Sequence, residues 1–155
     1  MNRTELQNLL SSWFEGLEFG GEDTQYLTVT VPREHLREFM LKLRDDDRTA
    51  FDYMFSLTAV DWMPQCLGVV YHLESTKHRH ILVVHVKTEN RTDKVNLDTV
   101  SDIYPTAEFH EREAYDLMGI VFDGHPDLRR LFLTDDWEGH PLRKDYVDEA
   151  KMIIK

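Results

Sequence analysis

The sequence predicts an α+β domain of two layers, in which a mixed β-sheet carries helices on one face and an extended C-terminal arm follows. Segments with helical and strand periodicity come in the order helix, strand, helix, several strands, helix, which is typical of such layers. The end of the chain is rich in turns, and Gly-His-Pro occurs there twice, at 124–126 and 139–141. A chain of 155 residues is most simply one domain. We therefore assign 1–122 to the body and 123–155 to an arm of the same domain.

Three segments have the periodicity of amphipathic helices. The first opens with the capping box Thr4–Gln7, carries leucines at helical spacing and ends near Gly16. The second starts at Pro32, which suits a first helical residue because its missing N–H would have no partner there. The third covers 107–118, where Gly119 stops it by tolerating a left-handed cap.

Strand patterns lie between these helices. Alternating apolar and polar residues predict a strand with one buried side at 26–31, and shorter apolar runs predict strands at 57–60 and 120–122. Two further runs, 66–74 and 80–87, are joined by a polar loop and predict a hairpin. The second of the two is apolar on both faces, which indicates a central position in the sheet.

Charge and composition exclude several classes of function. The net charge of −11 argues against a general nucleic-acid binder, because phosphate contacts need a cationic surface. Cys66 is the single cysteine, so we expect no internal disulfide and no Cys-ligated iron–sulfur cluster or zinc ribbon. No apolar run approaches the roughly 20 residues of a membrane span, and the N-terminus is unlike a signal peptide. We expect membrane association only through other proteins.

The charged run 110–113 superficially resembles a zinc-protease motif, but an alanine stands where that motif needs its second histidine. Glu111 and Glu113 point to different faces of a helix, so they do not form a catalytic pair. Arg112 and Asp116 share a face, and we expect a salt bridge between them. No phosphate-binding loop, nucleophile elbow or dinucleotide fingerprint occurs. A metal-dependent hydrolase stays open as an alternative, built on His110, Glu111, His125 and His140.

The arm interleaves large apolar residues, among them Trp137 and Tyr146, with the basic clusters 129–130 and 143–144. Trp, Tyr and Arg are the residue types that anchor protein interfaces. We expect the four basic side chains to pair with carboxylates or carbonyls of a neighbouring protein. The alternative is that the arm only folds back over its own sheet.

Three motifs carry a resemblance to a known family: EREAYDLMGI at 111–120, GHPDLRR at 124–130 and GHPLRKDY at 139–146, with Phe122 between the first two. Thr58–Asp61 is similar to an earlier strand of the same family. In these residues the chain resembles the 30 kDa subunit of respiratory complex I, which in bacteria is the C subunit of the proton-translocating NADH:quinone oxidoreductase.

The resemblance implies a non-catalytic structural subunit of the hydrophilic arm, docked onto the quinone-site subunit and the iron–sulfur subunits. It implies no cofactor on this chain, with NADH, FMN, iron–sulfur clusters and quinone bound by other subunits. It also implies a peripheral position on the cytoplasmic face of the bacterial membrane. The equivalent subunit of a complex-I-related membrane-bound hydrogenase is the alternative within the family.

The expected interface and family-motif residues lie in the third helix and the arm. The charges at 111–116 are expected to hold that helix against the start of the arm. The full set is Glu111, Arg112, Glu113, Asp116, Gly119, Gly124, His125, Pro126, Arg129, Arg130, Gly139, His140, Pro141, Arg143, Lys144 and Asp145.

Overall fold

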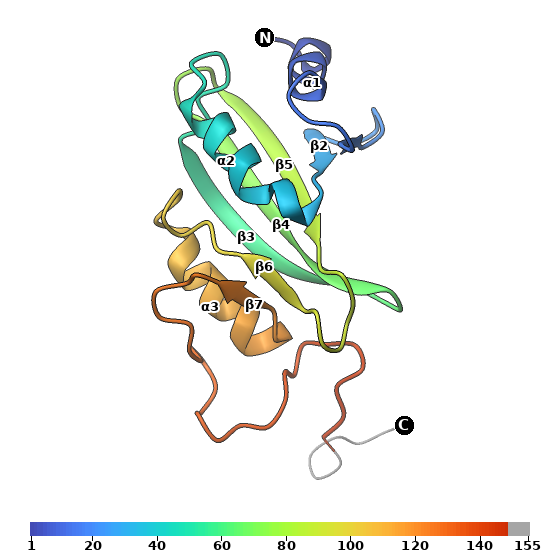
Figure 1. Cartoon of the computed structure of the whole chain (residues 1–155), viewed down its shortest axis with the longest axis vertical. Coiled ribbons are helices and arrows are strands. Elements are labelled where there is room, and N and C mark those ends of the chain that lie inside the picture. The colour runs from blue at the N-terminus through green and yellow to red at the C-terminus, as the bar shows by residue number, and fades with distance from the viewer. Residues whose placement is uncertain (149–155) are drawn as a thin grey trace.

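The computed structural model describes residues 1–148 (Figure 1). Its strands form a five-stranded sheet in the order β1-β2-β5-β4-β3 and a separate two-stranded sheet of β6 and β7. The helical elements are α1 (Arg3–Ser11), the 3-10 turn η1 (Arg33–His35), α2 (Leu36–Asp45) and α3 (Ala107–Met118). The strands are β1 (Glu18–Phe19), β2 (Leu27–Thr30), β3 (Tyr53–Trp62), β4 (Cys66–Ser75), β5 (His80–Lys87), β6 (Asn96–Asp98) and β7 (Val121–Asp123).

The large sheet has one covered face and one open face. It is mixed, since β2 pairs with β5 in parallel while β3, β4 and β5 are antiparallel. Side chains in register alternate between the faces, because successive residues of a strand point to opposite sides. A buried row crosses β3, β4, β5 and β2 as Leu57, Tyr71, Val84 and Val29. The adjacent row is only partly covered or exposed: Thr58, Val70, His85 and Thr30.

The helices cover the face with the buried row. α2 lies over the sheet, and α3 lies beside β3 together with β6 and β7 (Figure 1). The apolar side of α2 is fully buried in the core through Leu36, Phe39, Met40 and Leu43. The two-layer α+β class with helices on one face is therefore confirmed.

Several local predictions hold to within a residue. The hairpin appears as β4 and β5, and β5 is the central strand. The third helix spans the predicted residues and ends at Gly119, whose φ of 74° is left-handed. The extended piece after it is β7, which pairs in parallel with β6. The strand β6 is not among the strands that the sequence predicted.

Two helix starts differ from the prediction. The capping box of α1 uses Asn2 and Glu5, not Thr4 and Gln7, because the helix begins earlier and the Asn2 side chain accepts from Glu5 N at 2.9 Å. α1 also ends at Ser11, well before Gly16. Pro32 precedes a short 3-10 turn instead of opening the second α-helix directly.

After β7 the chain has no helix or strand as far as residue 148. This segment, 124–148, is called the arm below. Its turns and bends carry it along α3 (Figure 1), and the expected extended arm is not confirmed. The predicted boundary at 122 falls inside β7. The predicted arm residues 149–155 lie outside the described part of the chain.

Candidate functional site

Asp116, near the end of α3, is the point to which the arm is attached. Its carboxylate is fully buried, and Oδ2 accepts from the backbone N–H groups of residues 131–133 at 3.1, 2.7 and 3.1 Å. Its Oδ1 accepts from Arg130 Nη1 at 3.0 Å. Burial alone would raise the pKa of Asp116, but these donors outweigh burial and hold the pKa below its usual value. Four N–H donors on one buried carboxylate fix the arm's backbone here.

Two arginines complete this attachment. Arg130 Nη2 donates to the carbonyls of Trp137 and Gly139, both at 2.9 Å. Arg112 of α3 donates to two carbonyls of the arm at 3.3 and 3.1 Å. The expected salt bridge between Arg112 and Asp116 is therefore wrong. Arg130 brings its guanidinium to Asp116 from the arm, and Arg112 is engaged by the arm's carbonyls.

The two Gly-His-Pro copies are turns that bring an imidazole to α3. Gly124 and Gly139 have φ of 84° and 82°, which favours glycine. His125 donates from Nε2 to the carbonyl of Glu108 at 2.9 Å, since its Nδ1 accepts from a backbone N–H. His140 lies with Nδ1 3.0 Å from a carbonyl near the other end of the helix. Burial lowers the pKa of His140, which favours the neutral ring.

Glu111 faces the loop before α3. Its buried carboxylate accepts from Thr99 Oγ1 at 2.5 Å and Val100 N at 2.8 Å. His125 Nε2 lies 3.8 Å from Glu111 Oε2, and neither side chain is exposed. Burial raises the pKa of Glu111 to about 7, although the two hydrogen bonds oppose that shift. The carboxyl group therefore joins the loop, the helix and the first turn of the arm, with no access for a substrate. Glu113 is exposed.

The end of α3 receives Arg143 from the arm. Arg143 Nε donates to the carbonyl of Met118 at 2.6 Å, which is one of the carbonyls that a helix end leaves without a partner. Gly119 follows, and a Cβ there would lie 2.5 Å from His140 Cδ2 and 2.7 Å from Arg143 Nη2. This position therefore needs glycine both for its left-handed backbone and for the close approach of the arm.

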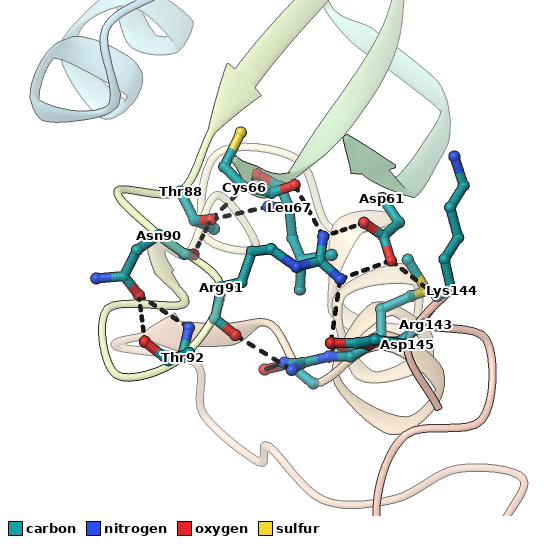
Figure 2. A network of polar contacts seen from close by, with 12 residues as sticks. Asp61, Cys66, Leu67, Thr88, Asn90, Arg91, Thr92, Arg143, Lys144 and Asp145 are labelled. Carbon is teal, nitrogen blue, oxygen red and sulfur yellow. Dashed lines mark hydrogen bonds and ion pairs between the residues drawn. The ribbon is translucent and has the colours of Figure 1, made fainter. Parts of the chain in front are cut away.

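A second attachment joins the arm to the far end of β3 (Figure 2). Arg91 forms a two-pronged ion pair with Asp61, whose side chains are only 10% and 3% exposed. Asp61 Oδ2 also accepts from the backbone N–H of Lys144 at 2.8 Å, and Asp145 lies 3.4 Å from Arg91 Nη2. The hydrogen bond from Arg91 is the main cause that lowers the pKa of Asp61. Arg143 donates to the carbonyl of Arg91 at 3.4 Å.

Sequence reasoning missed Arg91, because it lies in a run without periodicity and pairs with a residue 30 positions earlier. Asp61 was part of the motif similar to the family's early strand, but it received no role. Asp61 itself was a usable signal. The alternation of the strand turns its side chain toward the core, and a buried carboxylate needs a partner.

The cations of the arm bond mainly within the chain. Arg130 and Arg143 bond to α3 as described, and Arg129 pairs with Asp127 at 2.9 Å. The expected pairing of these arginines with a neighbouring protein stays a prediction. The ammonium of Lys144 points away from the network (Figure 2). The interface role of the motif residues, Pro126 and Pro141 among them, stays a prediction.

The arm exposes several large apolar side chains among exposed charged ones such as Asp135, Asp136 and Glu138. Phe132 is 65% exposed and Leu142 is 60% exposed. Phe109 of α3, Leu131 and Val147 are also exposed. Exposed large apolar side chains gathered along one segment mark protein-binding surfaces.

The metal-site alternative gains nothing from the geometry. His125 contacts the first half of α3 and His140 contacts its last turn, so the two imidazoles are kept apart. Within residues 1–148, no group of three or more His, Cys, Asp or Glu side chains is placed to hold a metal ion. No helix in that range is long and apolar enough to cross a membrane.

Comparison with known proteins gives consistent relatives. The C/D subunit of the NADH-quinone oxidoreductase of Phocaeicola vulgatus is 56% identical over 122 residues, which are 79% of this chain and 23% of that protein. The C subunit of the same enzyme from Saccharopolyspora erythraea is 43% identical over 127 residues, 80% of this chain and 50% of that protein. The C subunit from Acidothermus cellulolyticus is 42% identical over 135 residues, which are 85% of this chain and 69% of that protein. The chain thus spans half or less of the first two relatives.

Two solved structures share the fold. A chain of the membrane-bound sulfane sulfur reductase, an archaeal respiratory membrane complex, matches with a TM-score of 0.80 and 29% identity, covering 95% of this chain and 86% of that one. A trypsin-resistant fragment (1–134) of Nqo5 matches with a TM-score of 0.69 and 29% identity, covering 82% of this chain and 100% of that one. The sequence profile described as the respiratory-chain NADH dehydrogenase 30 kDa subunit matches residues 29–151. The chain therefore belongs to the family of the 30 kDa subunit of respiratory-chain NADH dehydrogenase.

Proposed function

We propose that this chain is a non-catalytic structural subunit of the hydrophilic arm of a proton-translocating NADH:quinone oxidoreductase. The observation that carries the proposal is that the arm has one side bonded to the body of the chain and apolar side chains exposed on the other. Its buried carboxylate and arginine contacts fix the backbone against α3, while Phe132 and Leu142 are left outside. A segment fixed in place with apolar side chains outward is preorganised to bind another protein.

The proposed partners are the quinone-site subunit and the iron–sulfur subunits. By this proposal the quinone-site subunit is the D subunit, and support for it as a neighbour comes from relatives whose name joins the C and D subunits, in which the region similar to this chain is less than a quarter of the protein. Two subunits that occur on one polypeptide must lie close together in the assembled complex. By this proposal NADH, FMN, iron–sulfur clusters and quinone bind to other subunits, and this chain lies at the cytoplasmic face of the bacterial membrane as a peripheral component.

The test is co-purification from native membranes with a tag on this chain. The wild type is expected to bring down a quinone-site subunit and iron–sulfur subunits. Phe132→Asp is expected to lose them, because it places a charge in the apolar surface that the partner covers. Tyr53→Asp is the control, since Tyr53 is a comparably exposed aromatic residue at the start of β3. Loss of partners from neither variant, or from both equally, would count against an interface on the arm.

A second candidate is the equivalent subunit of another respiratory membrane complex. The match to the archaeal sulfane sulfur reductase favours it, because that match covers more of this chain than the Nqo5 fragment does. A complex-I-related hydrogenase belongs to the same class. The companions in the same co-purification decide, since a hydrogenase partner would carry cysteine pairs that ligate nickel.

A further inference from the structure

Glu113 differs from the other charged motif residues of α3. Glu111, Arg112 and Asp116 are buried and bond to the loop before the helix or to the arm. Glu113 is exposed, and within the described part of the chain no hydrogen bond or ion pair reaches its carboxylate. This side of α3 therefore carries a negative charge that no described side chain neutralises by contact.

A half-open pocket lies beside Glu113, between the packed side chains of α3 and β3, and is called the α3–β3 pocket below. It has about 350 Å³ of empty space, part of which is open to solvent. Ala114 and Met118 of α3 and Leu57 of β3 are buried and make its floor apolar. Glu113 and Leu142 of the arm also line it, and both are exposed. The pocket thus has an apolar floor and a rim that solvent reaches.

Two alanines explain why the space is not filled from within. Ala59 of β3 and Ala114 of α3 both line the pocket, and each side chain ends at a single methyl group. Ala59 points to the same face of the strand as Leu57, toward the helices. Protein interiors are otherwise close-packed, with few voids larger than a water molecule. A hollow of this size at the surface therefore has room for a side chain from outside.

Leu142 joins the α3–β3 pocket to the arm. Its backbone N–H donates to the carbonyl of Leu117 at 3.0 Å, which fixes this point of the arm against α3. The side chain of Leu142 is 60% exposed and lines the pocket. The pocket is therefore continuous with the exposed apolar side chains of the arm that are proposed to face the D subunit.

We infer that the α3–β3 pocket takes one apolar side chain of the D subunit, and that Glu113 pairs with a Lys or Arg beside that side chain. Binding energy at protein interfaces is concentrated in anchor residues that fill well-packed, desolvated pockets. The apolar floor fits such an anchor. A partner that covers the rim takes the Glu113 carboxylate out of water, and this is costly unless a cation faces it. A second copy of this chain, which carries −11, would be repelled.

This inference rests on the proposed function, because the occupant is a subunit of the same complex. Relatives whose name joins the C and D subunits favour the D subunit over other members of the complex as the neighbour. What is added is the chemistry that the D subunit must present here, an apolar side chain with a cationic neighbour.

The first test fills the pocket from β3. Ala59→Leu is expected to raise the Kd of the full chain for the D subunit of the same organism about tenfold or more, measured by calorimetry, because the anchor side chain is shut out. Ser56→Leu adds similar apolar bulk to the opposite face of the same strand and is expected to leave the Kd unchanged. Equal Kd values for the two variants overturn the pocket and leave the proposed function standing. Failure of the wild type to bind the D subunit overturns both.

A second measurement needs no substitution. In the complex of the wild-type chain with the D subunit, methyl NMR is expected to show contacts between the methyl groups of Leu117 and a side chain of the partner. A complex that forms without such contacts overturns the pocket even where Ala59→Leu fails to fold.

The charge at the rim is tested separately. Glu113→Lys reverses it and is expected to raise the Kd for the D subunit about tenfold. Glu38→Lys makes the same change at an exposed site on α2 and is expected to leave the Kd unchanged. Equal Kd values for these two variants overturn the ion pair. A dimer of the chain alone in sedimentation, abolished by Ala59→Leu, would assign the pocket to a second copy and overturn the D subunit as its occupant.

Discussion

Replacing Asp116 with asparagine tests how the arm is held. The carboxylate accepts three backbone N–H groups at 2.7 to 3.1 Å and pairs with Arg130. Asparagine keeps one acceptor oxygen but turns an NH2 group toward donors of the arm, and it leaves the Arg130 guanidinium without its counter-charge. Loss of one partner from a buried hydrogen-bonded ion pair costs about 3–5 kcal/mol. The free energy that holds the arm closed should fall by about that amount.

Limited trypsin digestion measures this change, because the arm carries Arg129, Arg130, Arg143 and Lys144 as cleavage sites. Cleavage tracks the population of the open arm when opening is fast, so Asp116→Asn is expected to be cut roughly a hundredfold faster or more. Asp127→Asn removes the same charge from an exposed pair in the arm and is expected to be cut at the wild-type rate. Equal rates for the two variants would refute the role of Asp116.

Three further predictions concern buried groups. The pKa of Glu111 rises from 4.5 to about 7 on folding, so its contribution to stability is complete below pH 4.5 and is lost as the pH rises through 7, by about 3 kcal/mol. Glu111→Gln should therefore make the urea midpoint of unfolding depend less on pH between pH 5 and 8. The same pH dependence in the variant and the wild type would contradict this. Arg91→Met strands the buried carboxylate of Asp61 and should lower the free energy of unfolding by about 3–5 kcal/mol, and adding Asp61→Leu should recover most of it in the same urea titration. Gly119→Ala should lower the midpoint of thermal unfolding more than Gly124→Ala does, because both positions have positive φ but only the Cβ at 119 meets atoms closer than 3 Å. An equal decrease for the two variants would mean that the arm moves away from Gly119 without loss of stability.

Local patterns predicted most of the fold. The hairpin, the central strand and the third helix follow from hydrophobic periodicity and turn residues within a few positions, and each was correct. β6 was not predicted, because three residues are too few to show an alternation. The start of α1 was misplaced by two residues since Asn2 and Thr4 are both good caps, and only the folded helix shows which one is used.

The contacts of the arm were beyond pattern reasoning. The i,i+4 spacing correctly put Arg112 and Asp116 on one face, but it could not show that Arg130 would compete for the carboxylate from the arm. Composition favoured a partner protein for the arginines. A closer physical cue was the end of α3, where unpaired carbonyls attract Arg side chains. Arg143 takes that place.

The central claim is that this chain supports a redox complex and performs no redox chemistry itself. The most direct measurement is quinone-dependent NADH oxidation by membranes from a strain that lacks the chain, beside the purified chain alone. The expected result is loss of activity and of the assembled complex in the membranes, with both restored by the added gene, while the purified chain holds no iron or flavin and has no turnover. A purified chain that oxidises NADH or carries a stoichiometric redox centre would contradict it.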